Sequence, residues 1–154
     1  MFFSENGVLF NKAKTTLIQY PAGKTDANYN IPNSVTSIGV DAFASSNSLT
    51  SIVIPNSVVS IGSNAFQECI GLTSVTIPNS VTSIESMAFF GCNSLAEIIN
   101  YATTPQTLNI TDSIGGIFDG VNESAVLYVP AEAIEAYRAA EVWKDFANIE
   151  AIVK

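Results

Sequence analysis

Cys69 and Cys92 carry the most reactive side chains of this 154-residue sequence, and they lie 23 positions apart. Two thiols could form a disulfide, and a single activated thiolate could act as a nucleophile. The chain contains no histidine, which removes the commonest general base and the commonest metal ligand. A Cys–His catalytic pair is therefore excluded, and the two cysteines call for a structural or a redox explanation.

Carboxylates are the next candidates for chemistry. The acidic residues in the middle of the chain match neither an EF-hand nor a Gly-Asp-rich calcium repeat; they are Glu68, Glu85, Glu97, Asp112, Asp119 and Glu123. The densest group, residues 112–123, contains three glycines and is more typical of a solvated loop than of a metal site. No serine lies in a Gly-x-Ser-x-Gly motif. We therefore expect no enzyme activity, no metal and no cofactor.

The charge distribution argues against several classes of partner. Fourteen acidic and six basic residues give a net charge of −8, and no basic residue lies between Lys24 and Arg138. We expect no binding to nucleic acid or to an anionic membrane, because both need clustered Lys and Arg. No apolar run approaches the roughly 18 residues of a membrane span, so we expect no membrane insertion. The first residues do not have the pattern of an export signal.

An internal repeat determines the elements that must position these residues. The sequence Ile-Pro-Asn-Ser-Val-Thr-Ser-Ile begins at Ile31, returns with one substitution at Ile54, and returns unchanged at Ile77. Further landmarks follow at the same step of 23 residues: the Ala-Phe pairs 42–43, 65–66 and 88–89, and then Leu49, Leu72 and Leu95. Such a repeat predicts a solenoid, in which each unit buries its apolar face by stacking on its neighbours.

Each repeat is expected to form one coil of mostly β structure. In residues 72–77 apolar side chains alternate with polar ones, which predicts a strand with one face inward, ended by Pro78. A second short extended segment is expected at residues 81–84, and a tight helical turn should place Ala88 and Phe89 in the centre of the coil. Successive coils should pair strand on strand as parallel ladders.

The chain reads as a single domain, residues 1–154, whose ends differ from the repeats as caps must. We expect an N-terminal β-hairpin cap over residues 1–25, regular repeats over 26–100, a degenerate repeat with an insertion over 101–130, and a C-terminal cap over 131–154. Helical periodicity over residues 131–146 and a last strand over 149–153 make up the C-terminal cap.

The repeat also places the cysteines. Because their spacing equals the repeat, Cys69 and Cys92 should occupy the same position in adjacent coils, with Cα atoms about 5 Å apart and within disulfide range. A disulfide could form if the protein is exported. Otherwise both are small, semi-buried residues of a turn, and this reduced, structural role is the one that we expect.

The side chains that face outward are the candidate binding site. If Val75 and Ile77 face inward, the residues beside them face solvent, and the 23-residue step extends this set to Asn28, Asn30, Ser51, Val53, Ser74, Thr76, Glu97 and Ile99. We call these eight residues the outward strip. Solenoids typically bind partners with such faces. Ser and Thr could equally be there for β propensity and for hydrogen bonds to one another.

The pattern Ile-Pro-x-Ser-Val-x-Ser-Ile-x(3)-Ala-Phe-x(5)-Leu resembles the BspA-like leucine-rich repeats of bacterial surface proteins, especially those of Bacteroidetes. Residues 7–12 resemble that family's leading segment, and residues 127–130 and 143–146 resemble its trailing one, so the resemblance covers nearly the whole chain. It implies a leucine-rich repeat solenoid of the α/β horseshoe class. It also implies a secreted or surface-attached protein with a role in adhesion, and it supplies no catalytic residue.

Two functions remain open from the sequence. The first is a non-enzymatic module that binds a host extracellular-matrix protein, a cell-surface protein or a glycan through the outward strip. The alternative is a structural spacer of a larger surface protein, with no ligand of its own. A monomer is expected in either case.

Overall fold

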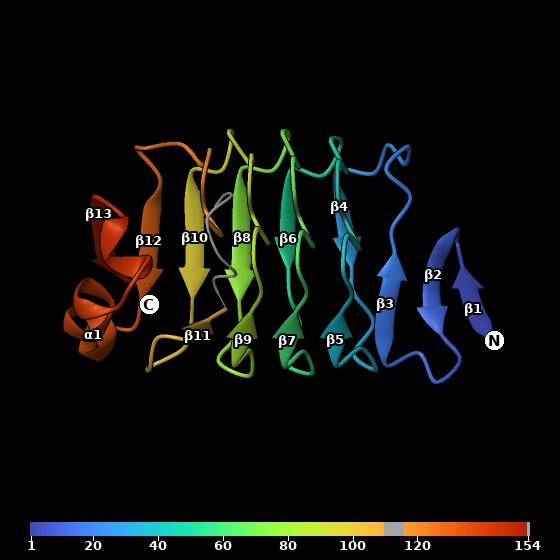
Figure 1. Cartoon of the computed structure of the whole chain (residues 1–154), viewed down its shortest axis with the longest axis horizontal. Helices are drawn as coiled ribbons and strands as arrows, with labels where there is room; N and C mark the ends of the chain where they lie inside the picture. Colours follow the sequence, from blue (N-terminus) through green and yellow to red (C-terminus); the bar gives the residue numbers. More distant parts are fainter. Residues whose placement is uncertain (110–115, 154) are drawn as a thin grey trace.

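The computed structural model describes residues 1–109 and 116–153. Two β-sheets form the sides of a short solenoid, and they overlap over the regular coils (Figure 1). One sheet continues into the hairpin at the N-terminal end, and the other continues to the strand beside the helix at the C-terminal end. Each regular coil contributes one strand to each sheet. The expected fold class, a mostly-β leucine-rich repeat solenoid with parallel ladders, is confirmed.

One sheet is parallel and has six strands. From the C-terminal end of the solenoid its strands are β13 (Asn148–Ala151), β12 (Val126–Val129), β10 (Glu97–Asn100), β8 (Ser74–Ile77), β6 (Ser51–Val53) and β4 (Asn28–Asn30). Equivalent residues of neighbouring coils are strand partners: Ser51 is paired with Ser74, and Ser74 is paired with Glu97. From β4 to β10 the register of this sheet therefore follows the 23-residue step.

The other sheet has seven strands. In spatial order they are β1 (Phe2–Glu5), β2 (Val8–Asn11), β3 (Thr16–Gln19), β5 (Ser37–Ile38), β7 (Ser60–Ile61), β9 (Ser83–Ile84) and β11 (Thr107–Leu108). The first two pairings are antiparallel and the others are parallel. The antiparallel pair β2–β3 is the expected N-terminal hairpin cap, and β1 adds an edge strand that the sequence analysis did not predict.

A column of aromatic rings fills the centre of the solenoid. Neighbouring rings are nearly parallel, with centroids 4.9, 5.2 and 5.6 Å apart in the series Phe43, Phe66, Phe89 and Phe118. Tyr20 stacks on the first ring of the series, and Trp143 packs against the last at 5.1 Å. One phenylalanine per coil thus lies on a common axis, and its buried area stabilises the contact between coils.

The chain enters the centre of each coil through β-turns. Six residues with φ between 55° and 72° recur at the repeat step: Asp41, Asn64 and Met87, and then Ser45, Glu68 and Gly91. Left-handed residues four positions apart interrupt any helix. The helical turn predicted at Ala88 and Phe89 is therefore wrong, and the hydrogen bond from the Ala88 amide to the Glu85 carbonyl closes a single turn instead.

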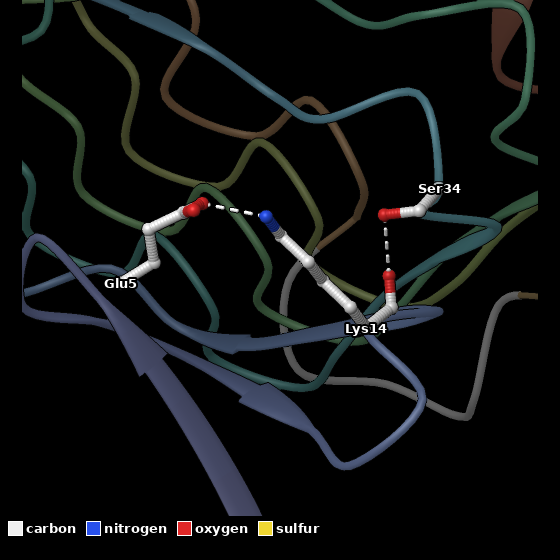
Figure 2. Close-up of polar contacts among 3 residues, drawn as sticks. All are labelled: Glu5, Lys14 and Ser34. Carbon is white, nitrogen blue, oxygen red and sulfur yellow. Dashed lines mark hydrogen bonds and ion pairs between the residues drawn. The ribbon is translucent and has the colours of Figure 1, made fainter.

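Side chains of the hairpin turn fasten the N-terminal cap to the first coil (Figure 2). Lys14 Nζ forms an ion pair with Glu5 Oε2 at 2.6 Å and lies 5.5 Å from the ring centroids of Phe3 and Phe10. Ser34 Oγ donates a hydrogen bond of 2.8 Å to the carbonyl oxygen of Lys14. One lysine therefore links β1, the hairpin and the first repeat.

The C-terminal cap contains less helix than the periodicity predicted. A 3₁₀ turn at Ala131–Ala133 leads into α1 (Ile134–Ala139), and a separate 3₁₀ turn follows at Trp143–Asp145. Val142 between them has φ of 70°, which is incompatible with a helix. A continuous helix over residues 131–146 is therefore a wrong prediction. The expected last strand is present as β13, which pairs with β12.

Candidate functional site

The outward strip lies on the solvent side of the six-stranded sheet. The alternating inner residues Val75 and Ile77 are buried, whereas Thr76 is half-buried and Val53 is 64% exposed. The structure brings the eight predicted residues together in two rows across β4, β6, β8 and β10: Asn28, Ser51, Ser74 and Glu97 in one row, and Asn30, Val53, Thr76 and Ile99 in the other. Their role in binding stays a prediction.

Two further strands extend the strip beyond the predicted residues. Val126 is paired with Glu97, and Tyr128 with Ile99, after a step of 29 residues instead of 23. β13 then adds Asn148 and Glu150 to the two rows. The longer step hid these four residues from the periodicity. The signal that could have found them is the Leu-Tyr-Val-Pro sequence at 127–130, which repeats the apolar alternation before a proline.

The N-terminal half of the strip is a polar ladder. Ser51 Oγ donates to Asn28 Oδ1, and just outside the strands Thr73 Oγ1 donates to the carbonyl oxygen of Thr50 at 2.9 Å. Each of these hydroxyls uses its single donor within the protein and keeps acceptor capacity toward solvent. The ladder therefore stabilises the stack and can also accept hydrogen bonds from a partner.

Three hollows border the strip along the edge where the repeat proline ends each strand. The first, of about 380 Å³, is lined by Asn30, Ile31, Pro32, Asn33, Val53 and Pro55. A second, of about 350 Å³, lies between Asn56, Asn79 and Tyr101. The third, also of about 350 Å³, is lined by Glu97, Ile99, Tyr101, Tyr128, Ile152 and Val153, and we call it the Tyr101 hollow. Tyr101 borders two of the three hollows and is 47% exposed.

Tyr101 and its neighbour Asn100 occupy the positions that the first three repeats give to Ile-Pro. Asn100 is fully buried, and its side-chain amide forms two hydrogen bonds with that of Gln106, at 2.9 and 3.0 Å. The Tyr101 amide donates to the Ile77 carbonyl oxygen at 3.0 Å, a bond that proline could not make. These contacts fix the backbone that presents the Tyr101 side chain.

The same turn anchors the C-terminal cap. Tyr137 Oη donates to the carbonyl oxygen of Ala102 at 3.1 Å, and Trp143 Nε1 donates to that of Gln106 at 3.4 Å. Burial raises the pKa of Tyr137, which favours the protonated hydroxyl that donates this bond. The cap that supplies β13 to the strip is thus held in place by buried hydrogen bonds.

The two cysteines are buried, free thiols in adjacent coils. Cys69 Sγ donates to the Phe43 carbonyl oxygen and Cys92 Sγ to that of Phe66, each at 3.0 Å. The neighbouring Cys69 thiol and burial both raise the pKa of Cys92, which disfavours the nucleophilic thiolate. Both thiols are free in the structure, and their reduced, structural role stays a prediction.

No group of three or more Cys, Asp or Glu within residues 1–109 and 116–153 is arranged to hold a metal ion. Within the acidic group at 112–123, Asp112 and Gly115 lie outside the described residues. The described part of the chain also contains no helix with the length and apolar character needed to cross a membrane.

Comparisons with known proteins place this geometry among bacterial repeat proteins. The sequence pattern of the BspA type leucine rich repeat region matches residues 24–114, in six copies. No curated protein matches the sequence.

Several solved structures have the same fold. A leucine-rich repeat protein from Eubacterium ventriosum superposes over 98% of this chain, with a TM-score of 0.70 and 24% identity. The pneumococcal vaccine antigen PcpA superposes over 99% of this chain, with a TM-score of 0.63 and 25% identity. A leucine rich cell surface protein from Faecalibacterium prausnitzii also superposes over 99% of this chain, with a TM-score of 0.54 and 26% identity. This chain spans 39%, 48% and 40% of those three chains respectively.

Proposed function

This chain belongs to the BspA-type leucine-rich repeat family, and from that premise we propose that it is a bacterial surface or secreted module that binds a macromolecule through the outward strip. Two of the similar solved structures are described as a vaccine antigen and as a cell surface protein, which supports this location. The partners proposed are an extracellular-matrix or cell-surface protein of a host, or a glycan. The proposed role is non-enzymatic.

One feature carries the proposal: the face of the six-stranded sheet is extended, open to solvent and poor in charge. Val53 is 64% exposed on β6, and the outward residues of the two neighbouring strands, β4 and β8, are polar. Charged side chains normally keep such a surface soluble, and exposed apolar residues in a continuous face are typical of interaction sites. The polar ladder beside Val53 offers hydrogen-bond acceptors that a partner could use.

A structural spacer is the second candidate. Both sheets run through the regular coils, and the chain spans less than half of each of the three similar structures. A rigid rod of this kind needs no ligand and would separate other parts of a longer surface protein. The two functions differ in one measurable property, because only the binding module has a saturable partner that depends on the strip.

Binding of the purified, folded chain to immobilised fibronectin, fibrinogen, mucin and a glycan array tests the proposal. We expect saturable binding to one of these ligands and a loss of affinity of at least tenfold in the Val53→Lys variant. The matched control is Val59→Lys, because Val59 is also exposed, at 47%, but precedes β7 of the other sheet.

Retention of binding in Val59→Lys together with its loss in Val53→Lys would support the strip. Equal losses in both variants, or none in either, would exclude it as the binding face. A folded wild-type chain that binds nothing in the panel would favour the spacer. Far-UV circular dichroism of all three proteins checks that each is folded.

A further inference from the structure

We propose that the Tyr101 hollow is the specificity pocket of the outward strip and receives an arginine or lysine side chain of a protein partner. The inference rests on the proposed function, because it assigns a class of partner to the same face. It is carried by a change in residue types at one coil, by the chemistry of the lining and by the charge around it.

Residue types change at three alternate positions between β8 and β10, of which the first two belong to the outward strip. Ser74, Thr76 and Pro78 of one coil are followed, at the repeat step, by Glu97, Ile99 and Tyr101 of the next. Ser and Thr already satisfy the needs of a strand and of a polar ladder. A scaffold role therefore leaves an exposed tyrosine beside an isoleucine and a glutamate without explanation, whereas a pocket requires them.

The lining matches the shape and polarity of a basic side chain. Ile99, Ile152 and Val153 supply apolar side chains, two tyrosines supply aromatic rings, and the exposed Glu97 supplies a carboxylate. Lys and Arg bury an apolar stem while the charged group stays near water or a carboxylate. Aromatic faces attract the same cations. The volume of about 350 Å³ is large enough for one such side chain.

The charge around the hollow is negative and is not neutralised by the described residues. Glu97 and Glu150 lie on the strip, and Glu150 is the strand partner of Tyr128. The four ion pairs of the described chain involve other carboxylates and use Lys14, Lys24, Arg138 and Lys144. None of the described residues that line the hollow is basic. A cationic group is therefore the complementary ligand.

A sugar fits this lining less well than a basic side chain. Glycan sites provide several directed hydrogen bonds to hydroxyl groups, in addition to an aromatic face. Half of the lining consists of aliphatic side chains that can make none: Ile99, Ile152 and Val153. The observations therefore favour a protein segment over a glycan at this pocket.

Nuclear magnetic resonance titration of the ¹⁵N-labelled chain tests the inference without knowledge of the natural partner. The probe is a capped pentapeptide with central arginine flanked by valine and threonine. The reference peptide carries citrulline, the neutral isostere of arginine. We expect saturable amide shifts around Glu97, Ile99, Tyr101 and Tyr128 with the arginine peptide, and affinity at least fivefold weaker with citrulline.

Two carboxylate variants complete the test. Glu97→Gln should weaken binding of the arginine peptide at least fivefold, and Glu132→Gln should leave it unchanged. Glu132 is also exposed but lies in the C-terminal cap and does not line the hollow. Because Glu97 is exposed, the substitution should leave the amide spectrum that of a folded protein.

Equal affinity for the arginine and citrulline peptides, shifts elsewhere on the protein, or equal effects of the two variants would overturn the inference. If N-acetylglucosamine shifted the amide resonances of the residues that line the hollow and the arginine peptide shifted none of them, the hollow would be a glycan pocket instead. The proposed function fails separately, in the Val53→Lys comparison, because that variant reports on the strip at a distance of two coils from Glu97.

Discussion

Asn100 is a buried polar side chain placed where three earlier coils have isoleucine. An unsatisfied buried amide costs about 1–3 kcal/mol, so such a residue persists only with partners. Gln106 supplies two hydrogen bonds, and the Ala102 amide donates a third at 3.2 Å. At the scale of single residues, this substitution fixes the turn that presents Tyr101 and holds the C-terminal cap.

Restoring the repeat residue at this position should destabilise the protein. We expect Asn100→Ile to lower the free energy of unfolding by about 1–3 kcal/mol, because the buried Gln106 amide loses its partner. The measurement is urea denaturation followed by circular dichroism. Asn100→Ile combined with Gln106→Leu should recover at least half of the loss, because it removes both partners. A stabilised single variant would contradict this role of Asn100.

Because of Tyr20, the free energy of unfolding should vary with pH in the alkaline range. Burial and the neighbouring Asp26 carboxylate raise the pKa of Tyr20 to about 12, against about 10 in an unfolded chain. The folded state favours the neutral phenol, so this stabilisation is complete below pH 10 and is lost as the pH rises to 12. We expect a loss of at most about 1.4 kcal/mol per pH unit from this group.

Urea denaturation of wild type and Tyr20→Phe at pH 9, 10 and 11 checks this expectation. The free energy of unfolding of the wild type should fall more steeply with pH than that of the variant. Some dependence should remain in the variant, because burial also raises the pKa of Tyr29 to about 12. Identical slopes for the two proteins would show that Tyr20 does not carry the effect.

The sequence predicted which side chains face outward, because alternation along a strand is a local property. Val75 and Ile77 are buried as expected, and Thr76 lies between them on the solvent side. The amide pair of Asn100 and Gln106 could not be predicted in the same way. It depends on how two side chains meet across a turn, and no periodicity encodes that contact.

At the scale of elements, coils are held together by like residues stacked on like. The phenylalanine column runs through the regular coils and continues to Phe118, 29 residues beyond Phe89. Strands, registers and the N-terminal hairpin could be predicted because each follows from repeat spacing or from polar turn residues. The helical turn could not be excluded, because Met87 and Glu68 adopt left-handed backbone without being glycine. Val142 breaks the C-terminal helix for a similar reason.

Removing one ring from the column should weaken the whole stack. We expect Phe66→Ala to lower the free energy of unfolding by about 3–5 kcal/mol, because it leaves a cavity between Phe43 and Phe89. Phe2→Ala is the control. Because Phe2 is exposed on the edge strand β1, this substitution should lower the free energy of unfolding much less. Chemical denaturation measures both. A cost below about 1 kcal/mol for Phe66→Ala would mean that the column is not a main source of stability.

At the scale of the whole molecule, the stack aligns one outward face over six strands. The regular repeats predicted four of these strands and the C-terminal cap predicted the last, β13, but the outward residues of β12 and β13 were not assigned to the strip, because an insertion lengthens the step to Val126. The Tyr101 hollow includes Tyr128 from β12 and Ile152 from just after β13, so it could not be assembled from the regular repeats alone. A binding face that ends at the C-terminal cap depends on that cap being folded.

The most direct test of the account compares the affinity of two lysine variants for whichever ligand the wild-type chain binds. Thr76→Lys places a charge in the middle of the outward strip, and Thr82→Lys places the same charge on an exposed threonine beside β9, in the other sheet. We expect at least a tenfold loss of affinity for Thr76→Lys and wild-type affinity for Thr82→Lys, with both variants folded. Wild-type affinity for Thr76→Lys, or a loss confined to Thr82→Lys, would contradict the assignment of the binding face.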